Sequence, residues 1–418
     1  MGKKICVIGL GYIGLPTAAL FSYYGYDVLG VDVNENIITN LIKGKITITE
    51  PGLEGLTKFV VEEGSLKASL IPDEADIFII AVPTPINKDK TANLQYVIEA
   101  SRSIIKYLKK GNVVVLESTS PMGTTEEIVK PILEESGLKM GVDVFLGYCP
   151  ERVIPGNIIE ELIKNNRIVG GINNSSAIEI KKVYKTMVQG EIYLTNCKTA
   201  EMCKLMENTF TDVNIALSNE LAMICESTGI NAWEVIEYCN KHPRVNLMNP
   251  NPGVGGNYLA VDPWFIVEKE PDLANLIFLS RTINDNMPLY VYNKIINLME
   301  SDNSKKVTIL GITYKADVDD IRESPIIKII DILRANQIKV DIYDPYVKGY
   351  YLCKDNIIEA CKNSDLLVIG VEHNDFKTLP LEEIRIVMKG NIILDTRNFL
   401  DSTEVKKYGF KYKILGDS

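Results

Sequence analysis

The first thirty residues are the part of this chain that most restricts its fold. Residues 4–9 (KICVIG) are a short β-rich run, and the sequence GLGYIG at residues 9–14 follows at once. Residues 15–24 have the composition of a helix, and a second β-rich run at residues 27–31 ends in Asp32. A strand, GxGxxG, a helix, a strand and an acidic residue in this order are typical of the βαβ unit that binds dinucleotides.

Each part of this unit has a physical role in binding a dinucleotide. The first glycine allows a tight turn, the second lets the backbone approach the pyrophosphate, and the third lets the helix pack on the strand. The helix N-terminus offers free N–H groups and a positive dipole end to the phosphates. Asp32 can bond both ribose hydroxyls, and its charge would repel a 2′-phosphate, so we expect NAD rather than NADP. The residues predicted to bind NAD here are Gly9, Gly11, Tyr12, Ile13, Gly14 and Asp32.

Further apolar runs extend this unit into a larger sheet. Strands are expected at residues 77–82, 113–117 and 144–148, with helices around residues 94–108 and 126–135. Continuous apolar strands that alternate with helices predict a parallel, doubly wound sheet, whose ligands bind beyond the carboxyl ends of the strands. The sequences VPTP, EST and CPER stand at these ends, and each could equally be a plain strand-ending turn.

The middle of the chain predicts one long helix. Residues 198–228 contain no proline or glycine, and at about 1.5 Å per residue they would span roughly 45 Å. Lys204 and Asn208 lie one turn apart on its polar face, where they could be solvated or could hold one oxygen atom together. A helix of this length without a core of its own also predicts a dimer interface, so we expect a homodimer.

The last third of the chain predicts a second α/β sheet that lacks a GxGxxG sequence. Its expected strands are residues 306–311, 339–343, 366–371 and 391–394. Residues 311–325 stand where the GxGxxG sequence would be, and they bring Lys315 and Arg322 to the end of the first strand. Both cations are suitable donors to phosphate or carboxylate, so we expect a phosphorylated ligand smaller than a dinucleotide.

Together these patterns predict an α/β protein with two Rossmann-like, doubly wound parallel-sheet domains joined by a long central helix and a helical middle domain. A chain of 418 residues exceeds one ordinary core, and we place the domains at residues 1–196, 197–300 and 301–418. The net charge of −10 argues against a nucleic-acid or anionic-membrane partner, which would need a basic face. Residues 5–26 are uncharged, but their glycines favour a strand-turn-helix over a membrane span.

Cysteine and histidine usage points to a reducing compartment and to the absence of a metal. The eight cysteines are scattered and form no CxxC pair, which predicts free, mostly buried thiols in a cytoplasmic protein. The chain has only two histidines, His242 and His373, so there is little from which to build a zinc site. We therefore expect no bound metal.

The motifs of the chain resemble, in their order, those of the UDP-glucose/GDP-mannose dehydrogenase family over nearly the whole length. They are GLGYIG, VPTP, EST, CPER, EMCKLMEN, HPRVN, PGVGG, AVDPWF and DDIRESP. No single motif decides the matter, but the set is highly specific. HPRVN together with AVDPWFIV is most similar to the UDP-N-acetylmannosamine dehydrogenase branch of the family.

The resemblance implies roles for particular residues. NAD would be bound by the N-terminal domain and UDP by the C-terminal one, with the sugar C6 between them at the long helix. Lys204 and Asn208 would stabilise oxyanions at C6, Asp262 would orient a water molecule, and Glu151 would act as base in the hydrolytic half-reaction. The implied catalytic residues are Lys204, Asn208, Asp262, Tyr258, Glu151 and Thr119. The further implied cofactor contacts are Thr84, Thr119 and Arg322. The implied substrate contacts are Glu151, Arg152, Val153, Lys204, Asn208, His242, Arg244, Gly253, Gly255, Gly256 and Lys315, of which Arg244 can come from the partner subunit.

The chain departs from the family at the nucleophile of the second oxidation. In the family a cysteine follows the glycine pair by one residue, usually after a histidine, whereas here Asn257 and Tyr258 stand at these places. An aldehyde gives up a second hydride only after a nucleophile adds to it, and a thiolate adds to form a thiohemiacetal. A phenol, with a usual pKa of about 10, is a harder nucleophile than a thiol at about 8.5. We therefore expect weak or half activity.

The predicted function is that of an NAD-dependent 6-dehydrogenase that oxidises UDP-N-acetyl-D-mannosamine to UDP-N-acetyl-D-mannosaminuronate, with the second oxidation impaired in this chain. One alternative is a different substrate, UDP-N-acetylglucosamine or UDP-glucose. Two others are an enzyme limited to the first, reversible oxidation and a protein that binds NAD and UDP-sugar without catalysis. Cys149, in CPER, is a possible replacement nucleophile, although a cysteine at this place in the family is ordinarily structural.

Overall fold

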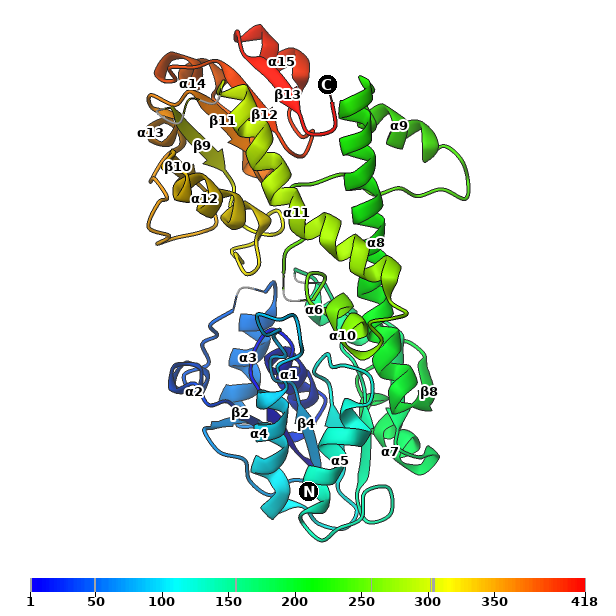
Figure 1. The fold of residues 1–418 in the computed structure, drawn as a ribbon. Helices are drawn as coiled ribbons and strands as arrows, with labels where there is room; N and C mark the ends of the chain where they lie inside the picture. Colours follow the sequence, from blue (N-terminus) through cyan, green and yellow to red (C-terminus); the bar gives the residue numbers. More distant parts are fainter. Residues whose placement is uncertain are drawn as a thin grey trace. The chain divides into compact units, whose positions relative to one another are not determined.

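Two units make up the part of the chain that the computed structural model describes, residues 2–48, 50–154, 156–256, 258–300, 302 and 305–417. Unit 1 comprises Met1–Glu207 and Trp264–Pro271, and unit 2 comprises Asn208–Pro263 and Asp272–Ser418. The chain passes from one unit to the other within two helices, α8 (Cys197–Thr228) and α10 (Asp262–Lys269), and again after Pro271 (Figure 1). The three domain boundaries expected from the sequence stay a prediction.

Unit 1 is built on an eight-stranded sheet in the order β3-β2-β1-β4-β5-β6-β7-β8. Its strands are β1 (Lys4–Ile8), β2 (Asp27–Val31), β3 (Leu66–Ser69), β4 (Ile77–Ile80), β5 (Val113–Leu116), β6 (Phe145–Tyr148), β7 (Arg167–Gly171) and β8 (Ile192–Asn196). Neighbours from β3 to β6 are parallel, whereas β7 runs antiparallel to β6 and parallel to β8. The predicted parallel doubly wound sheet is confirmed, and the reversed β7–β8 pair is an addition that the sequence analysis missed.

The core of unit 1 lies on both faces of this sheet. Ile5 and Val7 of β1 belong to one buried cluster, and the alternate residues Cys6 and Ile8 belong to the other. Because side chains alternate across a strand, a strand covered on both faces has to be apolar at every position. The covering helices are α1 (Gly14–Tyr23), α2 (Glu35–Ile42), α3 (Leu53–Glu62), α4 (Gln95–Ile104), α5 (Lys130–Glu134), α6 (Ile158–Lys164) and α7 (Asn174–Tyr184), with a π-helical turn, η2 (Thr124–Val129), before α5.

Unit 2 contains the second sheet, with five parallel strands in the order β10-β9-β11-β12-β13. The strands are β9 (Lys306–Leu310), β10 (Lys339–Tyr343), β11 (Leu366–Ile369), β12 (Ile392–Asp395) and β13 (Lys411–Ile414). The helices around it are α12 (Pro325–Ala335), α13 (Ile357–Cys361), α14 (Leu381–Val387) and α15 (Ser402–Lys407), with a short 3₁₀ turn, η3 (Asn374–Thr378). The second Rossmann-like sheet predicted from the apolar runs is thereby confirmed.

The two sheets share one local arrangement at the end of their first strands. In unit 1, Asp32 after β2 accepts a hydrogen bond from the Leu10 amide at 2.9 Å. In unit 2, Asp344 after β10 accepts one from the Ile312 amide at 2.7 Å. The unit 2 turn therefore keeps the acid of a dinucleotide-binding unit although the GxGxxG sequence is absent.

The remaining helices of unit 2 are α9 (Ala232–Cys239) and α11 (Asn275–Leu298), together with most of α8. Helix α8 begins at Cys197, one residue before the predicted start, and ends at the predicted Thr228. It buries polar side chains such as Asp212 and Asn219 and leaves Phe210 and Leu217 exposed. Among the described helices, none is long and apolar enough to cross a membrane.

Candidate active site

The glycine-rich turn of unit 1 lies at the switch point of the sheet, where β1 has β2 on one side and β4 on the other. Gly9 has a φ of +92°, and a Cβ there would meet the Ala81 carbonyl oxygen at 2.4 Å. A Cβ at Gly14 would lie 1.8 Å from the Gly9 carbonyl oxygen, so strand and helix pack too closely for a side chain. At Gly11 no protein atom lies within 4 Å of such a Cβ. Packing therefore does not require a glycine at this second position, which agrees with the close approach of a phosphate that the sequence analysis expects there.

Asp32 follows β2 beside this turn. Its Oδ2 accepts the Leu10 amide and its Oδ1 accepts the Asn34 amide, both at 2.9 Å. These contacts hold the carboxylate against the glycine-rich turn, where a ribose would lie in a dinucleotide-binding unit. The geometry therefore fits NAD, as the sequence analysis expected.

The strand ends of β4 and β5 come together in unit 1. The Thr84 hydroxyl donates a hydrogen bond to the Thr119 carbonyl oxygen at 2.6 Å, and the Val82 amide donates one to the Ser118 hydroxyl at 2.9 Å. Thr84 and Thr119, which were singled out from two separate motifs, are therefore in direct contact at the carboxyl edge of the sheet. Their contact follows from the parallel pairing of β4 with β5.

The CPER turn after β6 places a carboxylate beside the first half of α8. Glu151 and Lys204 are both almost fully buried, and Glu151 Oε2 lies 3.8 Å from Lys204 Nζ. Glu151 Oε1 also accepts the Val153 amide. A buried ammonium next to a buried carboxylate can hold or release a proton and can stabilise an oxyanion, because the low local dielectric strengthens both effects.

Arg152, predicted as a substrate contact, has partners within unit 1. Its Nε donates to Glu207 Oε2 at 2.9 Å and its Nη1 donates to the Asn166 carbonyl oxygen at 3.0 Å. Arg152 therefore ties the CPER turn to helix α8 through Glu207, next to the buried Glu151–Lys204 pair.

A buried polar cluster behind the CPER turn was missed by the sequence analysis. Glu117 accepts a hydrogen bond from the Tyr184 hydroxyl at 2.6 Å and lies 3.4 Å from the Arg167 guanidinium. Arg167 Nη1 is in turn 3.8 Å from Cys149 Sγ. The four residues come from β5, α7, β7 and the end of β6, and only the fold brings them together. The one sequence signal was an acid that directly follows the apolar run of β5.

Cys149 is not in a state to act as a nucleophile. The residue is fully buried. Burial raises the pKa of its thiol to about 11, and the nearby Arg167 only partly opposes this. Because the thiolate is the reactive form, Cys149 is essentially unreactive near neutral pH.

In unit 2, two predicted catalytic residues are in direct contact. Asn208 Nδ2 donates to Asp262 Oδ2 at 2.5 Å. The amides of Val261 and Asp262 both donate to the Tyr258 carbonyl oxygen, at 3.0 and 2.8 Å. The Tyr258 backbone therefore anchors the start of α10, and the carboxylate of Asp262 is oriented by the amide of Asn208.

The glycine-rich loop that precedes Tyr258 packs against the turn that carries Lys315. A Cβ at Gly255 would lie 2.7 Å from the Tyr314 Cβ, and one at Gly256 would lie 3.0 Å from the Tyr314 ring. The Gly256 amide donates to the Arg322 carbonyl oxygen at 3.1 Å. The loop residues and Lys315, singled out separately, are thus on adjoining segments. Asn257, at the family's histidine place, lies outside the described residues.

A chain of buried hydrogen bonds links the segment before this loop to helices α8 and α11. The Asn251 amide donates to Asn219 Oδ1 at 2.8 Å, and Asn219 Nδ2 donates to Asn284 Oδ1 at 2.9 Å. Asn284 Nδ2 donates to Asp212 Oδ1 at 2.9 Å, and Arg281 pairs with the same oxygen at 2.5 Å. Asp212 and Asn219, both on α8, are fully buried.

The remaining predicted contacts in unit 2 are His242, Arg244 and Arg322, and of these Arg322 lies at the glycine-rich loop, where its carbonyl oxygen accepts the Gly256 amide. His242 and Arg244 follow α9 and are exposed, with the Arg244 amide 3.3 Å from His242 Nδ1. Arg322, predicted to touch the cofactor, pairs through its guanidinium with Asp320, at 2.6 to 3.0 Å. Their roles stay predictions.

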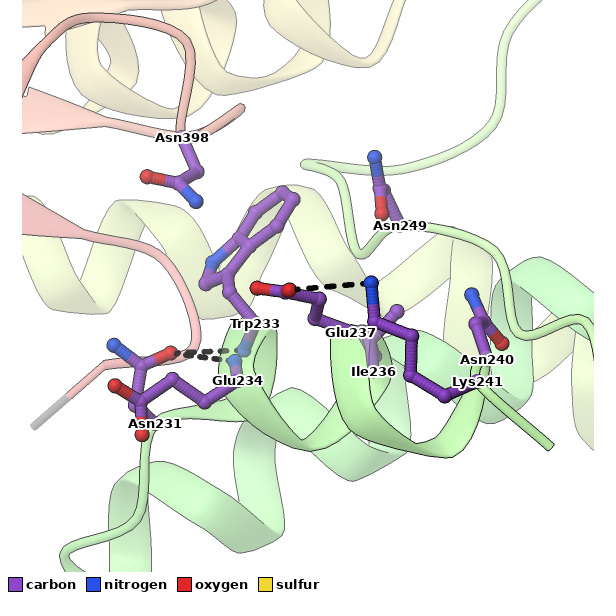
Figure 2. Close-up of a pocket in the computed structure, with 9 residues that line it drawn as sticks. All are labelled: Asn231, Trp233, Glu234, Ile236, Glu237, Asn240, Lys241, Asn249 and Asn398. Atoms are coloured by element: carbon purple, nitrogen blue, oxygen red, sulfur yellow. Dashed lines mark hydrogen bonds and ion pairs between the residues drawn. The ribbon is translucent and has the colours of Figure 1, made fainter.

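A pocket of about 500 Å³ lies elsewhere in unit 2, beside α9 (Figure 2). Its lining residues are Asn231, Trp233, Glu234, Ile236, Glu237, Asn240, Lys241, Asn249 and Asn398. Lys241 is the one cation in this lining, and Glu237 pairs with it at 3.4 Å, as Figure 2 shows. A diphosphate is usually held by several cations and free amides, so this pocket is a poor diphosphate site, and none of the residues singled out from the sequence lines it.

Three family models match the chain, and together they cover most of it. Residues 3–188 match the UDP-glucose/GDP-mannose dehydrogenase family NAD binding domain, residues 198–286 its central domain, and residues 308–402 its UDP binding domain. The UDP-N-acetyl-D-mannosamine dehydrogenase of Methanocaldococcus jannaschii is 46% identical over 423 residues, which are 100% of this chain and 97% of that protein.

Solved structures agree with this match. The UDP-N-acetyl-mannosamine dehydrogenase Cap5O from Staphylococcus aureus aligns with a TM-score of 0.91 and 46% identity over 99% of each chain. The UDP-D-ManNAc dehydrogenase from Pyrococcus horikoshii aligns with a TM-score of 0.93 and 39% identity, also over 99% of each chain. The fold of this chain is therefore the same as that of these two dehydrogenases.

Proposed function

This chain belongs to the UDP-glucose/GDP-mannose dehydrogenase family, and we propose from that premise that it oxidises C6 of UDP-N-acetyl-D-mannosamine with NAD. The observation that carries the proposal is the match to UDP-N-acetyl-D-mannosamine dehydrogenases at 46% identity over the full length. The NAD binding and UDP binding domain models support the two ligands. UDP-N-acetylglucosamine and UDP-glucose are the competing substrates.

The first oxidation needs a base for the hydroxyl proton and a stabiliser for the developing oxyanion. Bound NAD supplies the hydride acceptor, and the glycine-rich turn and Asp32 would hold it. Lys204 is a cation suited to a developing oxyanion, and Glu151 at 3.8 Å can exchange a proton with it. Asn208, oriented by Asp262, supplies a second polar group from the same helix, α8. The alcohol loses a hydride and a proton and becomes an aldehyde.

The second oxidation needs a nucleophile that this chain lacks at the family's position. Tyr258 offers a phenol, and Cys149 offers a buried thiol whose pKa burial raises to about 11. An aldehyde that has not added a thiolate or a hydroxide has no hydride to give. We therefore propose that the reaction in this chain stops mainly at the aldehyde, with one NADH formed per sugar.

Counting NADH per sugar oxidised tests this proposal. The protein is incubated with UDP-N-acetyl-D-mannosamine and excess NAD, with a hydroxylamine to trap the aldehyde. We expect about one NADH per sugar and a trapped oxime. Two equivalents without trapping would overturn the proposed role of Tyr258. No NADH, together with calorimetric binding of NAD and UDP, would show a binding protein without catalysis. Parallel assays with UDP-N-acetylglucosamine and UDP-glucose decide the substrate.

The variant Tyr258→Cys restores the family's nucleophile. We expect its NADH yield to rise from about one toward two per sugar, because the thiohemiacetal can then lose the second hydride. Tyr258→Phe is the matched control, since it removes the hydroxyl but adds no thiol. A yield that stays at one in Tyr258→Cys would place the defect elsewhere, with Asn257 as the next position to change.

We also propose that the protein is a cytoplasmic homodimer. Phe210, Leu217 and Ile224 follow each other at intervals of seven residues on α8, and each is more than half exposed. An apolar stripe repeated every two turns of a helix is a surface that a second helix can cover. The dimer would also explain why His242 and Arg244 are exposed, because a loop can serve the partner's site. Eight free thiols, one of them on exposed Cys239, support a reducing compartment.

A further inference from the structure

His373 is a fully buried histidine that no step of the proposed reaction uses. It follows β11 in unit 2 and lies close to two aromatic rings. Its ring centroid is 4.8 Å from that of Tyr346 and 5.3 Å from that of Phe376. A buried imidazole has to satisfy both ring nitrogens from its neighbours, so its contacts show what it does.

The contacts of His373 define one tautomer. Nδ1 lies 2.9 Å from the Asp317 amide nitrogen, which can only donate, so Nδ1 carries no proton. Nε2 lies 3.2 Å from Asp344 Oδ2. Burial disfavours ionisation of Asp344, but hydrogen bonds from His373 and from the Ile312 amide outweigh it and lower the pKa of that carboxyl. Asp344 is therefore an acceptor, and the ring proton is on Nε2.

These contacts hold the turn that carries Lys315 on both sides of that residue. Asp317, bound to Nδ1, is two residues after Lys315. Thr313, two residues before it, lies 3.3 Å from Nε2, and its hydroxyl donates to the Lys315 carbonyl oxygen at 2.7 Å. The imidazole ring thus contacts both flanks of the one lysine that the UDP-binding turn supplies.

The backbone at Asp317 shows that the turn is under constraint. Asp317 has a φ of +60°, a left-handed conformation that is uncommon outside glycine and persists where the surroundings impose it. Its Oδ1 accepts the Asn374 amide at 2.8 Å, next to His373 in the chain. The segment after β11 and the turn after β9 are therefore joined by several bonds, with the imidazole at their centre.

We propose that His373, as the Nε2–H tautomer, is a positioning residue that sets the Lys315 turn for the diphosphate of UDP. This rests on the proposed function, in which unit 2 binds UDP. His373 does not touch the ligand in this proposal. Its Nδ1 accepts a hydrogen bond from the Asp317 amide, and this contact fixes the position of the turn that carries Lys315.

Two substitutions separate the roles of the two ring nitrogens. His373→Asn places an amide oxygen close to where Nδ1 stands, so the Asp317 amide keeps an acceptor. His373→Gln places its polar group nearer the Nε2 position and leaves the Asp317 amide without one. Thr396→Val is the matched control, because it removes a buried hydrogen bond to the Ile369 carbonyl oxygen in the same sheet without a bond to the turn.

Calorimetric titration with UDP measures the effect. We expect His373→Gln to weaken UDP binding about tenfold, since one buried hydrogen bond is lost and the turn relaxes. His373→Asn is expected to stay within about threefold of the unaltered protein, and Thr396→Val to bind UDP as the unaltered protein does. Equal affinities for the Gln and Asn variants would overturn the proposal, as would an equal loss in Thr396→Val.

Nitrogen NMR of the histidine rings gives a second measurement that needs no ligand. Only two histidines are present, so a His242→Gln sample assigns the two sets of signals. We expect His373 to show a protonated Nε2 and an unprotonated Nδ1, and the Asp317 amide to exchange faster with solvent in His373→Gln than in His373→Asn. An Nδ1–H tautomer, or equal exchange in the two variants, would overturn the positioning role. A protein that shows the expected tautomer and amide exchange but does not bind UDP would instead contradict the proposed function.

Discussion

At the scale of single residues, our proposal makes position 258 the one that decides how far the oxidation can run. The backbone of Tyr258 has a structural role, since its carbonyl oxygen accepts hydrogen bonds from the amides of Val261 and Asp262 at the start of α10. These backbone contacts do not require a particular side chain at position 258.

Cys149 provides a prediction at the same scale. The pKa of its thiol is raised to about 11, so at pH 8 the thiolate fraction is on the order of one in a thousand. We expect Cys149→Ser to leave the NADH yield per sugar unchanged. Alkylation followed by mass spectrometry is expected to label the exposed Cys239 well before Cys149. A yield that falls by half or more in Cys149→Ser would identify this thiol as a replacement nucleophile.

At the scale of elements, α8 buries several polar side chains and exposes several large apolar ones. Its polar residues Asp212 and Asn219 are buried against the α11 residues Arg281 and Asn284, while its apolar residues Phe210, Leu217 and Ile224 are exposed. Within this buried ion pair Asn284 supplies one hydrogen bond to Asp212. The polar face therefore orients the loop at Asn251, and the apolar face remains for another surface.

One charged substitution on the exposed apolar face of α8 tests whether this face forms the dimer interface. We expect the unaltered protein to sediment as a dimer, at about twice the chain mass of 46.7 kDa. Phe210→Glu is expected to give a monomer, because a charge in the centre of an apolar interface is left desolvated and unpaired. Phe59→Glu on α3 makes the same change at another half-exposed phenylalanine and is expected to remain dimeric. A dimer that persists in Phe210→Glu would locate the interface elsewhere.

At the scale of the whole molecule, we expect a bound ligand to raise the free energy of unfolding of the protein. A ligand that binds only the folded state adds about 2.7 kcal/mol when present at about 100 times its dissociation constant. We expect NAD to raise the thermal midpoint of the protein and NADP to raise it much less, because Asp32 faces the ribose position. Scanning calorimetry with each cofactor measures this. Equal rises of the thermal midpoint with NAD and with NADP would contradict the role of Asp32. In Asp32→Asn we expect the rise with NAD and the rise with NADP to become more similar.

Much of the fold followed from local patterns. The glycine-rich turn, the acid after β2 and the long proline-free run of α8 are readable from the sequence because each depends on neighbours within about thirty residues. Strands β3, β7, β8 and β13 escaped prediction, since β3, β8 and β13 are half-exposed and partly polar and lack a continuous apolar run. The antiparallel direction of β7 leaves no mark in its residues.

In the candidate site, too, some features follow from the local sequence and others only from how the chain packs. By itself the sequence determined the family, the NAD-binding turn and the missing thiol at position 258, because motif residues and their order are properties of the chain alone. Only the tertiary structure decided that Glu151 meets Lys204, that Arg281 enters the core beside Asp212, and that His373 holds both flanks of Lys315. Those contacts join residues 53 to 69 positions apart, and pairing over such distances depends on how strands and helices pack rather than on local preference.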